Sequence, residues 1–301
     1  MVKIIFEWIY YGTNVMIAHS GAKWVPNIMD KLNDRWVYQT DLYPDIYEYK
    51  FVVDGKWVHD TAKPVVDDGY GGKNNIISIR NPDDLIRIVH ISDTHSLFTS
   101  LPPGEILVHS GDFSIDGHPG EYEQFNQWLG AQKFMYKIVV LGNHDLDYMM
   151  REKIDPVAVA PSKLSNAIVL SSEKINLMGI NFYGIQWYWF NRWNFSYYDK
   201  QYINCEEWYK IPSDTDILIT HGPPKFILDG DRDSPSGSYG LFLMIENIHP
   251  KYHFFGHIHH QYGHLTINWP DNQITHFYNS SLVSEDSSHI VNYPQVIYYN
   301  K

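Results

Sequence analysis

The sequence predicts two domains, a small all-β sandwich followed by a larger α/β domain. Residues 1 to about 80 contain short runs of β-branched and aromatic residues separated by turn residues, which is typical of strands. After residue 84 the chain carries short, nearly continuous apolar runs and one helical pattern, which together indicate a buried sheet layered with helices. A chain of 301 residues is long enough for two such domains.

The first predicted domain consists of strands joined by turns. The expected strands are Ile4–Trp8, Asn14–Ala18, Arg35–Thr40, Tyr47–Val53 and Ile76–Ile79. Asp54 and Gly55 stand between two apolar runs and both tolerate positive φ, so we expect a β-hairpin there. The polar segment Arg80–Asp84 contains a proline and predicts the boundary between a domain of residues 1–80 and one of residues 84–301.

The second predicted domain combines buried strands with a helix. The buried strands are expected at Ile86–Ile91, Ile106–Val108, Lys137–Leu141 and Asp216–Thr220. In the segment Glu121–Gln132, apolar side chains recur at helical spacing and predict an amphipathic helix. Further strands without intervening helices are expected at Leu265–Asn268, Thr275–Tyr278 and Val296–Tyr299. We expect these last strands to form a second, more antiparallel sheet packed against the first.

Composition and charge exclude several classes of function. The net charge of −12 argues against a nucleic-acid partner bound through a general basic surface. Cys205 is the one cysteine, so no intramolecular disulfide can form. The N-terminal apolar stretch carries Glu7 and lacks the features of a signal peptide, and no apolar run approaches the roughly 20 residues of a membrane span. We therefore expect a soluble cytoplasmic protein without a membrane partner.

Five short polar segments each close or follow an apolar, strand-like run. They are Asp93-Thr94-His95, Gly111-Asp112, Gly142-Asn143-His144-Asp145, His221-Gly222 and Gly256-His257-Ile258-His259. Carboxylates, imidazoles and a carboxamide are the donors that a pair of divalent cations needs. Side chains at the ends of successive strands of an α/β sheet also tend to converge. The pattern therefore predicts a two-metal hydrolytic site.

The segment Gly142 to Asp145 is the most specific of the five. The carbonyl oxygen of Asn143 can ligate a hard cation, and His144 can point toward a leaving group as an acid. We expect Asp145 to orient His144 through a hydrogen bond, as carboxylates beside metal sites commonly do. The alternative is an ordinary turn with a capping aspartate. Asp112, whose carboxylate has two oxygens, can bridge two cations.

The five segments, in this order, resemble the calcineurin-like metallophosphoesterase superfamily over residues 87 to about 265. Within them, Gly111-Asp112-Phe113-Ser114, Thr220-His221-Gly222-Pro223-Pro224 and Asn279-Ser280-Ser281 resemble a smaller group, the metallophosphoesterase-domain-containing proteins. The resemblance implies a two-sheet α/β sandwich flanked by helices, with the metals at the strand ends.

The same resemblance implies the ligands and the reaction. One metal would be held by Asp93, His95, Asp112 and His259, and the other by Asp112, Asn143, His221 and His257. A hydroxide bridging the metals would attack phosphorus in line, with His144 assisting the leaving oxygen. Some members of the smaller group have lost a metal histidine, but both are present here, so we expect an active enzyme. These donors suit manganese, iron and zinc nearly equally, which leaves the identity of the two divalent metal ions open.

The N-terminal residues Tyr49–Asp60 and Lys73–Ile77 resemble the glycogen-binding module of AMP-activated protein kinase β subunits, an immunoglobulin-like β-sandwich. In that family flat indoles stack on glucose rings, while a lysine and an asparagine amide hydrogen-bond the hydroxyls. The sugar-contact positions of the family fall on Trp24, Lys50, Trp57 and Asn74. The resemblance implies an α-glucan such as glycogen as a partner, although relatives with this fold also serve as docking or spacer domains.

Three functions follow from these patterns. The leading hypothesis is a metal-dependent phosphoester hydrolase, either phosphatase or phosphodiesterase, recruited to α-glucan by its N-terminal module. The second is a phosphodiesterase for cyclic nucleotides or other small diesters, with the N-terminal domain as an interaction module. The third is a non-catalytic carbohydrate- or protein-binding scaffold. The aromatic run Gln186–Trp193 offers stacking faces for a base or sugar, or else forms a packed lid or core.

Overall fold

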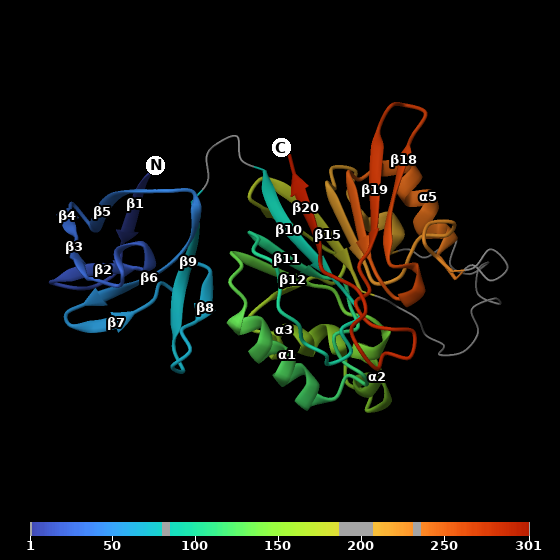
Figure 1. The fold of residues 1–301 in the computed structure, drawn as a ribbon, viewed down its shortest axis with the longest axis horizontal. Helices are drawn as coiled ribbons and strands as arrows, with labels where there is room; N and C mark the ends of the chain where they lie inside the picture. The colour runs from blue at the N-terminus through green and yellow to red at the C-terminus, as the bar shows by residue number, and fades with distance from the viewer. Residues whose placement is uncertain (1, 80–84, 187–206, 231–235, 301) are drawn as a thin grey trace.

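The computed structural model describes residues 2–79, 85–186, 207–230 and 236–300. In Figure 1 the N-terminal β-rich part stands beside a larger α/β part, in which two sheets are covered by helices on their outer faces. The predicted fold class is confirmed. Three sequence predictions fall outside the described residues, namely the boundary at Arg80–Asp84, the aromatic run from Trp187 onward and the lone Cys205. The division at residues 80 to 84 therefore stays a prediction.

The N-terminal part consists of two antiparallel sheets that enclose one core. The smaller sheet has the order β1-β5-β4, and the larger has the order β3-β2-β6-β9-β8 with β7 paired to β6. Alternate residues of β1 and β6, including Phe6, Trp8 and Phe51, are buried in this core, as the strand period of two requires. The strands are β1 (Val2–Trp8), β2 (Val15–His19), β3 (Asn27–Ile28), β4 (Asp30–Leu32), β5 (Arg35–Leu42), β6 (Asp45–Val53), β7 (Lys56–Val58), β8 (Val65–Asp67) and β9 (Lys73–Ile79).

The hairpin predicted from Asp54 and Gly55 is confirmed. Strands β6 and β7 pair antiparallel, with Val53 opposite Lys56. Asp54 and Gly55 have φ values of 49° and 82°, the positive values that a two-residue hairpin turn requires.

The α/β part is a sandwich of two sheets around a continuous apolar core. The first sheet has the order β13-β12-β11-β10-β20 and the second has the order β14-β15-β16-β17-β19-β18. The core between them is built from residues such as Ile88, Val108, Phe182, Ile219 and Phe254. The strands are β10 (Ile86–Ile91), β11 (Ile106–His109), β12 (Tyr136–Val139), β13 (Ile168–Val169), β14 (Glu173–Leu177), β15 (Ile180–Ile185), β16 (Ile217–Thr220), β17 (Tyr252–Phe255), β18 (Gly263–Asn268), β19 (Ile274–Asn279) and β20 (Gln295–Tyr299).

Helices cover the outer face of each sheet. Helices α1 (Pro119–Ala131), α2 (Asn143–Arg151) and α3 (Pro156–Lys163) lie over the first sheet, and α5 (Tyr239–Ile248) lies over the second. Short 3₁₀ turns occur at Ser20–Ala22, Trp208–Lys210 and His259–Gln261. The helix predicted from residue 121 is confirmed as α1, which begins two residues earlier because Pro119 suits the first helical position. None of the helices in the described ranges is long and apolar enough to cross a membrane.

The C-terminal strands differ in part from the prediction. Strands β18 and β19 pair antiparallel at one edge of the second sheet, as expected, but the strands at the centre of that sheet run parallel. Strand β20 lies in the first sheet instead, antiparallel to β10, where Ile297 and Tyr299 enter the core between the sheets. An alternating strand fits either sheet edge equally well, so its sequence pattern does not specify the partner.

The N-terminal part and the α/β part contact each other along one side of the α/β sandwich. Lys133, just after α1, forms an ion pair of 2.7 Å with Glu48 on β6. Lys73 on β9 donates to the side chain of Asn166. The hydroxyl of Ser78 donates to Glu105 at 3.1 Å. The larger N-terminal sheet therefore packs against the α/β part near α1.

Three buried histidines lie on strands near the proposed site, and one of them should make the stability of the protein depend on pH. The side chains of His90, His109 and His253 are 0% exposed. Burial lowers the pKa of His253 from 6.5 to about 3, so the folded protein keeps this ring neutral where the unfolded chain protonates it. Stability is therefore lost as the pH falls below 6.5. Between pH 7 and pH 5, protonation of His253 in the unfolded chain should lower the free energy of unfolding by about 2 kcal/mol.

The variant His253→Phe tests this prediction. Phenylalanine has a similar shape, and the surrounding rings of Phe255 and Phe277 are apolar. Urea unfolding at pH 7 and at pH 5 should show that the variant loses about 2 kcal/mol less than the wild type. An equal loss in both proteins would show that His253 is protonated in the folded state.

Candidate metal centre

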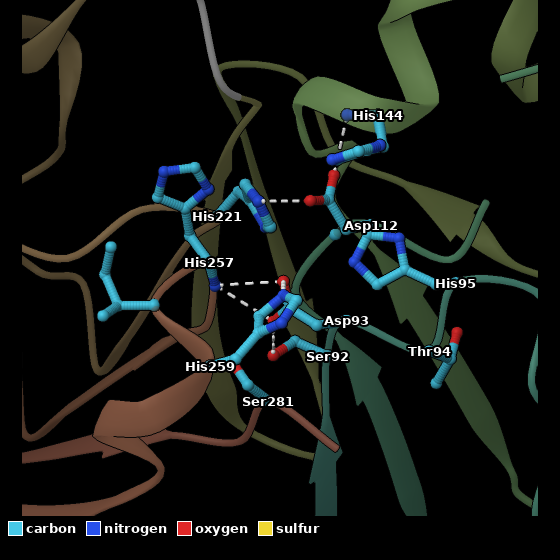
Figure 2. A network of polar contacts seen from close by, with 12 residues as sticks. Ser92, Asp93, Thr94, His95, Asp112, His144, His221, His257, His259 and Ser281 are labelled. Atoms are coloured by element: carbon cyan, nitrogen blue, oxygen red, sulfur yellow. Dashed lines mark hydrogen bonds and ion pairs between the residues drawn. The ribbon is translucent and has the colours of Figure 1, made fainter. Parts of the chain in front are cut away.

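The predicted metal ligands gather at one edge of the sandwich because the strands that precede them run parallel. Asp93 follows β10 and Asp112 follows β11, while Asn143 comes after β12 at the start of α2. In the second sheet, His221 follows β16, and the segment containing His257 and His259 follows β17. Figure 2 shows side chains from both sheets facing one another across this edge.

The Asp and His side chains form three overlapping groups. In each group the ligand atoms lie within 4.8 Å of one another. The groups are Asp93 with His95 and His259, His95 with Asp112 and His144, and Asp112 with His221 and His257. Asp112 and His95 each belong to two groups. The arrangement therefore has two ends, the group with Asp93 and His259 and the group with His221 and His257, which His95 and Asp112 connect through the middle group.

The backbone at these positions is held in a conformation that most residues avoid. Asp93, His95, Asp112 and His257 have φ values of 50°, 41°, 56° and 69°. Positive φ is uncommon outside glycine and costs energy, and it persists where the surrounding structure enforces it. Here it turns each side chain sharply out of its strand and toward the shared edge.

Hydrogen bonds to backbone carbonyls orient three of the histidines. The Nδ1 atoms of His95, His221 and His259 lie 3.1, 2.9 and 2.9 Å from the carbonyl oxygens of Ser114, Ser110 and Ser284, respectively. In this arrangement Nδ1–H donates and Nε2 of each ring faces the centre, so that a ring that is neutral directs its Nε2 lone pair there, the tautomer that metal-bound histidines use. Sequence patterns do not reveal these carbonyl partners.

Several buried polar atoms of the described residues lack a hydrogen-bond partner, and some of them lie at this site. They include Nε2 of His95 and the carboxamide Oδ1 of Asn143. A buried polar atom without a partner is costly and is normally explained by a water, an ion or a functional role. Burial also lowers the pKa of His95, and it lowers that of His257 to about 4, so both rings stay neutral. Neutral imidazoles and carboxamide oxygens fit a divalent metal ion.

Asp112 and His221 form a buried, charged pair. Their Oδ2 and Nε2 atoms are 3.1 Å apart. Burial alone would lower the pKa of His221, but the carboxylate of Asp112 outweighs it and raises this pKa from 6.5 to about 9. The same pairing holds the pKa of Asp112 well below 3.8 despite burial. A metal ion ligated by His221 must therefore displace a proton, which couples metal binding to pH.

The expectation that Asp145 orients His144 is wrong. The carboxylate of Asp145 accepts backbone N–H groups of Asp112, Gly142 and Ser114 at 2.8, 2.9 and 3.0 Å. As the third residue of α2, Asp145 points back to the N–H groups at the helix start, as acidic residues there commonly do. The ring of His144 is held elsewhere, with Nδ1 2.6 Å from the carbonyl oxygen of Ile115. Asp145 therefore joins the Asp112 loop to α2.

Three of the four candidate sugar-contact residues lie on adjacent strands of the larger N-terminal sheet. Lys50 is on β6, Trp57 on β7 and Asn74 on β9, while Trp24 stands in the loop after β2. The indole of Trp57 is exposed, at 50%. Lys50 forms an ion pair of 3.0 Å with Asp68.

Asn74 is occupied by a contact within the protein. It is only 7% exposed, and its Nδ2 donates to Oε2 of Glu48 at 2.9 Å. The other oxygen of Glu48 pairs with Lys133 in the α/β part. Asn74 is therefore tied into the contact between the two parts of the chain.

Comparison with known proteins shows two family matches. Residues 86–261 match the model of the calcineurin-like phosphoesterase family, and residues 2–86 match that of the glycogen recognition site of AMP-activated protein kinase. Human metallophosphoesterase domain-containing protein 1 is 35% identical over 206 residues, which cover 60% of this chain and 63% of that protein. A UPF0046 protein of Caenorhabditis elegans is 33% identical over 209 residues, which cover 64% of this chain and 72% of that protein.

The N-terminal part has relatives of its own. The β-1 subunit of bovine 5'-AMP-activated protein kinase is 30% identical over 105 residues, covering 33% of this chain and 39% of the subunit. The chain thus spans less than two thirds of the length of the human relative and a smaller share of the kinase subunit.

Proposed function

This chain belongs to the calcineurin-like phosphoesterase family, and we propose that it hydrolyses a phosphoester with the help of two divalent metal ions. The observation that carries this proposal is the series of three overlapping Asp and His groups, connected by His95 and Asp112, at one edge of the sandwich. Members of the family typically bind divalent metals. The buried Nε2 of His95 and Oδ1 of Asn143 add donors whose chemistry suits such ions.

In this proposal each ion takes ligands from both sheets. Asp93, His95, Asp112 and His259 would hold the first ion, and Asp112, Asn143, His221 and His257 would hold the second. Asp112 would contribute to both, because its carboxylate lies in one group with His95 and in another with His221 and His257. Nitrogen and oxygen donors of this kind suit manganese, iron or zinc, and availability decides among them.

The side chains around the proposed ions have separate roles in the reaction. When bound, the two cations activate water as a nucleophile and neutralise negative charge on the phosphoryl oxygens. His144 lies beside His95, with ring centroids 4.7 Å apart, and its Nδ1 is fixed by the Ile115 carbonyl. This leaves Nε2 of His144 as the proton donor to the leaving oxygen. Asp145 holds the Asp112 loop in place through its backbone hydrogen bonds.

The type of ester is best decided with chromogenic substrates. Metal-stripped protein supplied with Mn²⁺ should be assayed against p-nitrophenyl phosphate, a monoester, and bis-p-nitrophenyl phosphate, a diester. Preference for the monoester would support a phosphatase acting on phosphorylated glucan, and preference for the diester would support a phosphodiesterase. Either outcome fits the proposed site, whereas hydrolysis of neither ester would argue for a non-catalytic scaffold.

We further propose that the N-terminal module binds α-glucan chiefly through Trp57. Its indole is exposed and available to stack on a glucose ring, whereas Asn74 is buried against Glu48. The resemblance to the glycogen recognition site of AMP-activated protein kinase supports a glucan as the ligand.

Glycogen co-sedimentation tests this assignment. We expect Trp57→Ala to raise the Kd for glycogen about 5- to 150-fold and so to lower the pelleted fraction, since replacing an aromatic stacking residue by alanine costs about 1–3 kcal/mol. Asn74→Ala should have a smaller effect because its amide is already engaged by Glu48. Val58→Ala, which alters a half-buried neighbour on the same strand, is the control. If neither the wild type nor Val58→Ala pelleted, recruitment to glucan would be ruled out.

A further inference from the structure

The carboxylate of Asp93 is fixed so that one of its oxygens is saturated. Its Oδ2 accepts the hydroxyls of Ser92 and Ser281 at 2.6 and 2.7 Å and the backbone N–H of His257 at 3.0 Å, while the same N–H lies 3.2 Å from Oδ1. Its Oδ1 lies 3.3 Å from Nε2 of His259 (Figure 2). Because three donors already occupy Oδ2, Oδ1 is the oxygen that Asp93 presents beside His259.

A second buried residue holds both Ser281 and the histidine loop. The Oδ1 atom of Asn279 accepts the backbone N–H of Ser281 at 3.1 Å and lies 2.9 Å from its hydroxyl. The Nδ2 atom of the same amide donates to the carbonyl of Ile258 at 2.9 Å. Ile258 stands between His257 and His259, which are two proposed ligands. The amide of Asn279 therefore contacts the loop that carries these histidines, and it also contacts Ser281, whose hydroxyl binds the third proposed ligand, Asp93.

This cluster is packed without spare room. Asn279 and Ser281 are each 0% exposed, and Asn279 is anchored at the end of β19 opposite Phe255. A Cβ atom at Gly256 would lie 2.0 Å from the Ser92 hydroxyl and 2.1 Å from Oδ2 of Asp93. Only glycine fits there, so the start of the histidine loop lies directly against Ser92 and Asp93.

We propose that Ser281 and Asn279 are positioning residues that set the affinity of the ion held by Asp93, His95 and His259, although neither is itself a ligand. Ser281 orients the carboxylate of Asp93. Asn279 fixes the position of that carboxylate relative to the loop that carries His257 and His259. Asn279 is suited to this role because an amide donates and accepts at once, whereas an aspartate of the same shape cannot donate to Ile258. Partners of this kind typically change metal affinity 10- to 100-fold.

The proposal rests on the proposed two-ion site, and Mn²⁺ calorimetry on the metal-stripped full chain tests the two separately. The wild type should bind two Mn²⁺ ions. Ser281→Ala should weaken one of them by about 10- to 100-fold and leave the other within about threefold of its wild-type affinity. Asn279→Asp should weaken the same ion by at least as much. Ser288→Ala is the control, because it removes an exposed hydroxyl from the same C-terminal loop and should change neither ion.

The outcomes separate the two claims. If the wild type binds none of Mn²⁺, Fe²⁺ and Zn²⁺, the proposed function fails. If the wild type binds two ions and Ser281→Ala binds both with unchanged affinity, the positioning role is overturned while the proposed function stands. An equal loss of both ions would also overturn it, since a general structural defect does not select one site. Circular dichroism of the metal-free variants checks folding, and should Asn279→Asp fail to fold, Ser281→Ala decides alone.

Discussion

Replacing His144 with alanine should lower kcat about a thousandfold, within the range that general-acid catalysis typically contributes, while the protein still binds two Mn²⁺ ions. The ring of His144 is held by Ile115 beside His95, and our assignment makes it the proton donor rather than a ligand. The loss should depend on the leaving group. An alkyl phosphate needs protonation of its leaving oxygen and should suffer fully, whereas a nitrophenyl ester releases a stable anion and should suffer less.

The control for this variant is His264→Ala, which removes an exposed histidine on β18. Metal content measured on the same samples distinguishes loss of the acid from loss of an ion. Turnover of an alkyl phosphate by His144→Ala at nearly the wild-type rate would sink the assignment. Loss of an ion from this variant would instead make His144 a ligand, as its place in a group with His95 and Asp112 also permits.

The variant Asp112→Asn is expected to lose both ions and all measurable turnover. The carboxamide has the same shape as the carboxylate but lacks its charge, and it would place an N–H group or an uncharged oxygen where each ion needs an anionic donor. Because the carboxylate of Asp112 lies in one group with His95 and in another with His221 and His257, the change should affect both ends of the site. Calorimetry with Mn²⁺ and the chromogenic assay measure the two consequences.

A matched variant, Asp116→Asn, makes the same chemical change nearby. Asp116 is on the surface, where it pairs with Arg151, and it should retain both ions and most of the activity. If Asp112→Asn kept one Mn²⁺ ion at wild-type affinity, Asp112 would be a ligand of one ion only, and the bridging role would be excluded.

The convergence of the predicted metal-binding motifs could be foreseen because it depends on topology that leaves a clear sequence signal. Asp93, Asp112 and His221 each follow a short apolar run, and parallel strands bring their carboxyl ends to one edge. The orientation of these side chains was not predictable. It depends on carbonyl partners such as that of Ser114, and on positive φ at positions such as His95, neither of which leaves a mark in residue types.

The predictions were wrong where the sequence around a residue does not determine which distant residues it contacts. Strand β20 has the alternation of an edge strand, but only the fold determines that it pairs with β10. Asp145 stands next to His144 in sequence, yet the helix that begins at Asn143 turns its carboxylate toward backbone N–H groups instead. In both cases a contact distant in sequence decided the role. Asn74 matches a sugar-contact position and its amide donates to Glu48, so its contact with sugar stays a prediction.

The most direct test of the central claim is the metal dependence of phosphoester hydrolysis by the full chain. Protein stripped with a chelator should be assayed with a nitrophenyl phosphoester before and after addition of Mn²⁺, with Asp112→Asn in parallel. The proposed site predicts no turnover without metal, restored turnover with Mn²⁺ in the wild type, and none in the variant. Turnover that persists without metal or survives in Asp112→Asn would contradict it, as would inactivity of the wild type with Mn²⁺, Fe²⁺ and Zn²⁺ alike.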